Sequence, residues 1–134
     1  MENFKKFLQH YAKRTNSPFM EYSPTHFIIT CQISNDRKQQ VSAYFVEREG
    51  AKLVEFISKV VDTEQLQNID YKKILAYNQE WCSYSRFVLY GGMLQTAASA
   101  HYDFLTEAQM EVMLKEVAEV ADKLEEELTG SDFH

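Results

Sequence analysis

The residues best suited to covalent or metal chemistry are cysteines and histidines. The spacing of the cysteines indicates neither a metal site nor a redox centre. Cys31 and Cys82 lie 51 positions apart, and neither belongs to a C-x-x-C pair of the kind that zinc sites and redox centres use. Cys31 stands among alternating apolar residues, which predicts a buried structural thiol. Cys82 follows Trp81 at a predicted helix end, and a nucleophilic role there needs a nearby base that the sequence does not place.

The four histidines are His10, His26, His101 and His134. No two have the spacing of a helical metal pair, and none lies in an H-E-x-x-H or H-x-E context. His26 and His101 fall on predicted strands, so two alternatives stay open: isolated polar positions, or convergence in space as an acid–base or metal site. No P-loop, dinucleotide fingerprint or nucleophile elbow is present. We therefore expect no catalytic residue, no metal and no cofactor.

Three amphipathic helices are predicted by apolar residues that recur at helical spacing. The first covers residues 3–14, and the second covers residues 70–81 with Asp70 as its N-cap. Thr106 and Gln109 form a capping box that opens a long third helix, for which Gly130 is the natural end. The apolar stripe of this last helix consists of Met110, Met113, Leu114, Val117, Val120, Ala121, Leu124 and Leu128.

Between the helices the apolar period changes to two, which is typical of strands. Residues 25–33, 40–47 and 52–61 predict an antiparallel meander. Residues 86–90 and 93–102 predict a hairpin around Gly91-Gly92, because glycines supply the positive φ angles of a tight turn. The predicted order is α-β-β-β-α-β-β-α. This is an α+β fold with a five-stranded antiparallel sheet in a two-layer sandwich, formed by a single domain over residues 1–134.

Several predicted strands are apolar on both faces. Tyr44 and Val46 alternate with Phe45, and the run 86–90 carries large side chains on both sides. In a two-layer fold the second face of such a strand needs a cover. Either another polypeptide covers it, through self-association or peptide binding, or a tilted helix of the same chain does.

Charge limits the choice of partner. The chain has a net charge of −6, and residues 103–134 alone carry ten acidic and two basic residues, a net charge of −8. Such a chain repels nucleic-acid phosphates and anionic lipid. The acidic face of the last helix is either a solvated surface or a surface for a basic partner. No apolar run is long enough to span a membrane and no secretory signal opens the sequence, so we expect a cytoplasmic protein that binds neither nucleic acid nor membrane.

The second half of the chain carries a resemblance to a known family. Asn78 and Trp81 precede the run Ser-Arg-Phe-Val-Leu-Tyr at 85–90, the Gly-Gly turn, a second strand and a Leu-Thr-Glu helix start at 105–107. Together with the element order, the length and the acidity, this pattern resembles the YbjN-like proteins and the related class I type III secretion chaperones. The likeness covers about 60 residues well and the remainder by element order. It implies a small dimer without enzymatic activity, whose sheet and helix grooves hold an extended segment of a partner protein.

The resulting hypothesis is a homodimeric, chaperone-like or regulatory module that binds an extended segment of a partner protein and catalyses no reaction. An alternative is a small-molecule-binding protein or small enzyme with a pocket lined by tyrosine and histidine. The predicted dimer or partner surface consists of Ile74, Tyr77, Trp81, Arg86, Phe87, Val88 and Tyr90.

Overall fold

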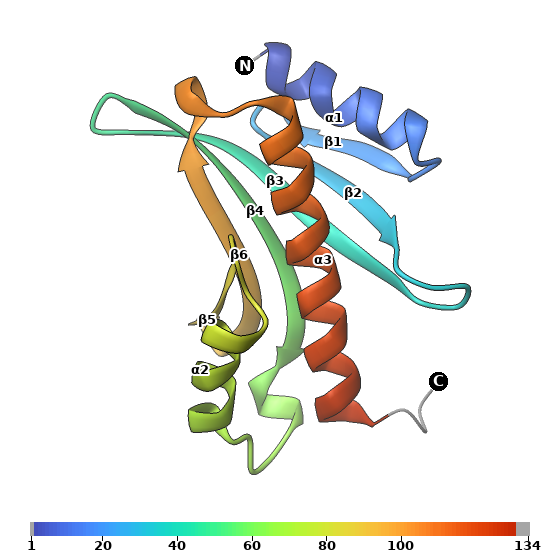
Figure 1. The fold of residues 1–134 in the computed structure, drawn as a ribbon, viewed down its shortest axis with the longest axis vertical. Helices are drawn as coiled ribbons and strands as arrows, with labels where there is room; N and C mark the ends of the chain where they lie inside the picture. The colour runs from blue at the N-terminus through green and yellow to red at the C-terminus, as the bar shows by residue number, and fades with distance from the viewer. Residues whose placement is uncertain (1, 131–134) are drawn as a thin grey trace.

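The computed structural model describes residues 2–130 and folds them into three α-helices, two short helical turns and six strands. The helices are α1 (Glu2–Arg14), α2 (Tyr71–Glu80) and α3 (Glu107–Thr129). The strands are β1 (Phe19–Ser23), β2 (His26–Gln32), β3 (Lys38–Arg48), β4 (Ala51–Asp62), β5 (Arg86–Tyr90) and β6 (Met93–His101). The turns η1 (Thr63–Gln65) and η2 (Tyr102–Phe104) follow β4 and β6. The strands form one antiparallel sheet in the order β1-β2-β3-β4-β6-β5, and α3 lies along it (Figure 1).

The predicted α+β class and antiparallel sheet are confirmed, but the strand count of five is wrong. The sixth strand is β1, an edge strand in which Phe19 pairs with Ile29 and Met20 with Ile28. Only five residues long, it stands between Pro18 and Pro24 and has three consecutive exposed residues. A segment so short and so weakly alternating gives no period-two signal, and only its pairing to β2 makes it a strand.

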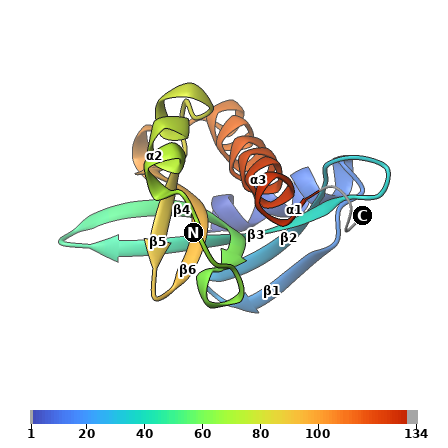
Figure 2. The same ribbon diagram turned by 90° about the horizontal axis from the view of Figure 1, so that it is seen from below.

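All three helices pack on the same face of the sheet, as the view from below shows (Figure 2). The ring of Phe4 on α1 lies 6.0–6.2 Å, between centroids, from the rings of Phe27, Phe45 and Phe56, which come from three neighbouring strands. No helix within residues 2–130 covers the opposite face. The two-layer architecture is therefore confirmed, and a tilted helix over the second face is excluded for the described part of the chain.

The predicted stripe of α3 forms the centre of the core. Seven of its eight members are buried, Leu114, Val117, Ala121 and Leu124 among them, and Leu128 is half-buried. The capping box is present: Thr106 Oγ1 accepts from the amide of Gln109, and Gln109 Oε1 accepts from the amide of Thr106, both at 3.1 Å. A 23-residue helix thus begins where its sequence signal predicts it.

One acidic residue of α3 does not belong to its exposed face. Asp122 is only 5% exposed, and its carboxylate accepts two hydrogen bonds from Arg37 Nε, at 3.0 and 3.1 Å. Arg37 comes from the turn between β2 and β3, so the pair ties that hairpin to α3. The acidic residues of α3 therefore do not all share the exposed face that the sequence predicts as either solvated or partner-binding. The reason is a tertiary partner 85 positions away.

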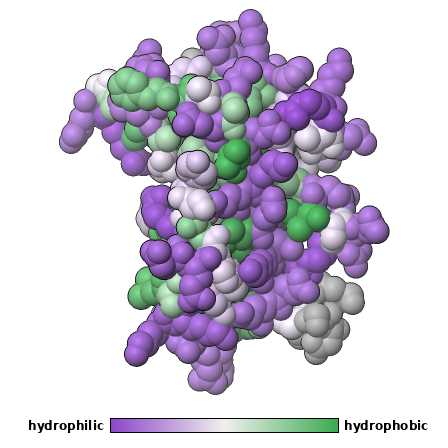
Figure 3. Space-filling model, in the orientation of Figure 1, coloured by the Kyte–Doolittle hydropathy of each residue, from purple (hydrophilic) through white to green (hydrophobic). Residues whose placement is uncertain are grey.

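The helix side of the molecule is largely hydrophilic, with small separate hydrophobic areas (Figure 3). Within residues 2–130, no helix combines the length and the hydrophobicity that a membrane span requires.

Candidate protein-binding surface

The sheet ends at β5, whose outer edge faces away from β6. A two-residue turn, Gly91-Gly92, joins the two strands and pairs Tyr90 with Met93. In an antiparallel pair the backbone groups of alternate residues point toward the neighbour, so those of Phe87 and Leu89 point to the open edge. The Phe87 amide donates there to Asn78 Oδ1 of α2, at 2.6 Å. Helix α2 therefore covers the backbone amide of Phe87 at the edge. The backbone groups of Leu89, the next outward-pointing residue, face away from β6.

Large apolar side chains surround this edge and are exposed to solvent. Tyr90 is 75% exposed, Leu75 66%, Leu89 54% and Tyr71 42%. Tyr71 and Leu75 lie seven and three positions before Asn78, so they share the side of α2 that reaches β5. We call these four residues the α2–β5 surface. Exposed apolar side chains that gather around a strand edge are typical of a surface that contacts another polypeptide.

The seven residues predicted for this surface fall into two groups. Ile74, Tyr77 and Phe87 are at most 8% exposed and belong to the core, where they hold α2 against β5. The others are Trp81 and Val88, which are half-buried, and Arg86 and Tyr90, which are exposed. The sequence pattern did not separate the core side of α2 from its open side. Tyr71, Leu75 and Leu89 were missed for that reason, although exposed apolar residues on a short helix beside an edge strand are a recognisable signal.

Trp81 fixes the end of α2. Its ring stacks on Tyr77 with 3.7 Å between centroids, and Lys123 Nζ of α3 lies 4.1 Å from the centroid of the indole ring. The Tyr77 hydroxyl donates to Glu127 Oε1 at 2.8 Å. These contacts join α2 to α3 through aromatic packing and a cation–π interaction.

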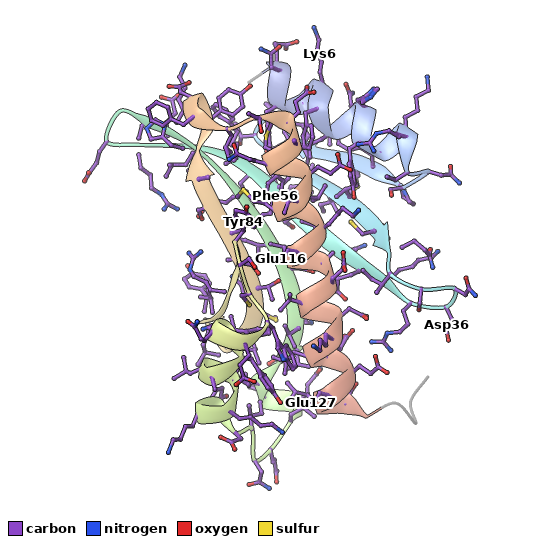
Figure 4. The ribbon with its side chains drawn as sticks, in the orientation of Figure 1. Lys6, Asp36, Phe56, Tyr84, Glu116 and Glu127 are labelled. Carbon is purple, nitrogen blue, oxygen red and sulfur yellow. The ribbon has the colours of Figure 1, made fainter. Side chains whose placement is uncertain are left out.

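The loop between α2 and β5 is held by a single carboxylate, that of Glu116 on α3. It accepts hydrogen bonds from the amides of Ser83, Tyr84 and Ser85 at 2.6–3.2 Å, and from the Ser85 hydroxyl at 2.5 Å. In Figure 4 the side chain extends from α3 toward this loop. Partial burial alone would raise the pKa of Glu116, but the hydrogen bonds from Ser85, Tyr84 and Ser83 outweigh it and hold the pKa below its ordinary value. The sequence carried no signal for this role, because Glu116 is one of many acidic residues on α3.

The chemistry-bearing residues do not come together. His26 stacks on Tyr44 with 4.2 Å between centroids, and His101 lies on β6, beyond β3 and β4. Three strand spacings of ~4.8 Å put the two backbones ~14 Å apart. Within residues 2–130, no group of three or more His, Cys, Asp and Glu side chains is placed to hold a metal ion.

Both cysteines are poor nucleophiles. Burial raises the pKa of Cys31 to about 11. Burial also raises the pKa of the half-buried Cys82. A groove of about 680 Å³ lies between the end of β4 and the end of α3. It is lined by four apolar residues, among them Leu66 and Leu128, and by five polar or charged residues, none of them tyrosine or histidine.

No protein-family model matches the sequence, and no curated protein matches it. Among solved structures, a chain in the crystal structure of the ExsC–ExsE complex is similar, with a TM-score of 0.67 and 18% sequence identity over 95% of this chain and 94% of that chain. The fold is that of the secretion chaperones. The family resemblance of the second half is thereby confirmed at the level of fold. At 18% identity the likeness establishes the fold alone.

Proposed function

We propose that the protein is a homodimeric, chaperone-like module without enzymatic activity, which binds a segment of a partner protein. One observation carries the proposal: the open β5 edge is surrounded by the four exposed apolar residues of the α2–β5 surface. The similarity to a chain from a complex of two proteins, ExsC and ExsE, supports a role in protein binding.

The α2–β5 surface suits contact between two copies about a two-fold axis. In such an isologous interface the same patch lies on both sides, so Leu75 and Tyr90 of one copy pack against the same apolar patch of the other. Burial of four large side chains per copy removes from water the apolar area that the α2–β5 surface exposes in each monomer. Pairing at the Leu89 position satisfies the backbone groups that β5 leaves at the edge.

Partner binding needs no reactive group. A protein-binding module uses strand edges and apolar surfaces. It requires neither a cysteine of lowered pKa nor paired histidines, and here the pKa of both cysteines is raised. We place the protein in the cytoplasm, where a chaperone-like module meets newly made partners.

The test begins with purification from the native host and identification of the proteins that co-purify, after which the purified partner is recombined with variants. The double variant Leu75→Asp, Tyr90→Asp is expected to be monomeric with an unchanged circular dichroism spectrum, since both side chains are exposed. The matched control is Val112→Asp, which makes the same kind of change at a 47% exposed position on α3. It should stay dimeric. Absence of any partner that rebinds the wild-type chain would contradict the proposed function.

A further inference from the structure

The sheet face opposite the helices is a second apolar surface, larger than the α2–β5 surface. We call it the outer sheet face. One row of paired residues crosses all six strands on this face. In sheet order the row consists of Met20, Ile28, Ser42, Ile57, Ala97 and Arg86. The large apolar side chains on this face are Met20, Tyr22, Ile28, Tyr44, Val46, Leu53, Ile57, Val88 and Tyr90.

The outer sheet face is basic, although the chain as a whole is acidic. Its charged residues are Lys38, Arg48, Lys59, Arg86, Glu55 and Asp62, which pairs with Met93 on this face, and their net charge is +2. One of the two acids, Glu55, is neutralised by Arg48, whose Nη2 lies 3.3 Å from a carboxylate oxygen. Helix α3, which packs on the other side of the sheet, carries eight acidic and two basic residues, a net charge of −6. The two sides of the molecule are thus opposite in sign.

This charge distribution decides between occupants of the face. A second copy docked face to face would bring two surfaces of net charge +2 together, which costs free energy and works against association. An acidic partner is attracted instead, and at physiological salt, where screening acts within ~8 Å, the local face matters more than the distant α3.

The dimensions of the face suit a helix. An apolar sheet face is ordinarily covered by amphipathic helices, as α1, α2 and α3 cover the other side here. Five strand spacings of ~4.8 Å give a width of ~24 Å, the length of a helix of about 16 residues. A stripe of apolar side chains on such a helix would pack along the row through Ile28 and Ile57, and acidic side chains beside the stripe would reach Lys59 and Arg86.

We propose that the outer sheet face binds an acidic amphipathic helix of the partner protein. This inference rests on the proposed function and specifies the chemistry of the segment that the protein holds. Self-association uses the α2–β5 surface, which meets the outer sheet face at Tyr90. The row through Ile28 and Ile57 ends at Arg86, four positions from Tyr90 along β5. The helix and a second copy therefore occupy different parts of the sheet.

The test uses a labelled peptide of about 16 residues with a leucine stripe and glutamate elsewhere, and measures its affinity for the full chain by fluorescence anisotropy. We expect binding that weakens as salt rises, and a loss of about tenfold or more in affinity for each of Lys59→Glu and Arg86→Glu. Both side chains are exposed, and a thermal melt checks that each variant folds. Lys13→Glu makes the same charge change on the exposed side of α1 and should leave affinity unchanged.

Two further probes separate amphipathic recognition from charge alone. The same peptide with lysine in place of glutamate should not bind, and neither should a single-stranded oligothymidylate of equal net charge. Equal binding of the two peptides, preferential binding of the oligonucleotide, or full affinity of Lys59→Glu and Arg86→Glu would overturn the inference. If the purified native partner still binds both variants as it binds the wild type, the inference fails while the proposed function stands. If no partner binds the wild type, both fail.

Discussion

The carboxylate of Glu116 accepts hydrogen bonds from both the amide and the hydroxyl group of Ser85, at 2.6 and 2.5 Å. Ser85 is the last residue before β5, so a side chain of the central helix sets where the edge strand begins. Asn78 then holds the amide of Phe87, two residues further on. The open edge and its apolar surroundings are therefore positioned by two polar contacts that come from different helices.

Replacing Glu116 with Gln should destabilise the fold by about 1–2 kcal/mol at pH 7, because four donors lose a charged acceptor. The pKa of Glu116 is lower in the folded chain than the ordinary value of 4.5. Its contribution is therefore fully present above pH 4.5 and is lost as the pH falls through the lowered folded pKa. Urea unfolding at neutral and acidic pH measures the difference between wild type and variant, which should shrink in acid. Glu119→Gln, an exposed position on the same helix, is the control, and an equal effect there would contradict this role.

Asn78→Ala should loosen β5 without removing the helix. The Phe87 amide loses its acceptor, so its hydrogen exchange should accelerate, and global stability should fall by about 1 kcal/mol. Amide exchange followed by NMR resolves this position. Unchanged protection of Phe87 would show that Asn78 does not close the edge in solution.

Asp122→Lys should destabilise the protein by about 3–5 kcal/mol, because it leaves the Arg37 guanidinium without its carboxylate and adds a like charge in a nearly buried place. Glu119→Lys, three residues earlier and exposed, should change stability by about 0.5 kcal/mol or less. Chemical denaturation compares the two. Similar midpoints would mean that the Arg37–Asp122 pair is solvated.

Leu114→Ala and Leu124→Ala should each cost about 2–5 kcal/mol, since both side chains are fully buried. Val112→Ala, at an exposed position on α3, should be nearly neutral. The midpoint of urea unfolding reports the comparison, and a small effect at Leu114 would show that the α3 stripe is not the centre of the core.

The sequence predicted the elements with strong local signals. Apolar spacing and the Thr106 capping box located α3, and the Gly91-Gly92 turn located the last hairpin, because each signal lies within a few residues of its effect. The edge strand β1 was missed because its structure comes from pairing with β2 and not from its own pattern. Local signals identified the fold class and missed the strand that depends on a partner.

The predicted dimer or partner surface includes side chains that the structure buries. Ile74 and Phe87 are apolar like Leu75 and Leu89, and only the packing of α2 on β5 decides which of them face the core. The polar contacts were beyond sequence reasoning, because Glu116 and Ser85 lie 31 positions apart and Arg37 and Asp122 lie 85 apart. Contacts of such separation have no signature in composition or period.

The mass of the protein in solution tests the central claim most directly. Light scattering at tens of micromolar should give a dimer, twice the chain mass of 15.7 kDa, for the wild type and for Val112→Asp. The variant Leu75→Asp, Tyr90→Asp should give the monomer mass with its circular dichroism spectrum intact. A wild-type mass of 15.7 kDa, or a double variant that stays dimeric, would contradict the account that the α2–β5 surface joins two copies of the chain.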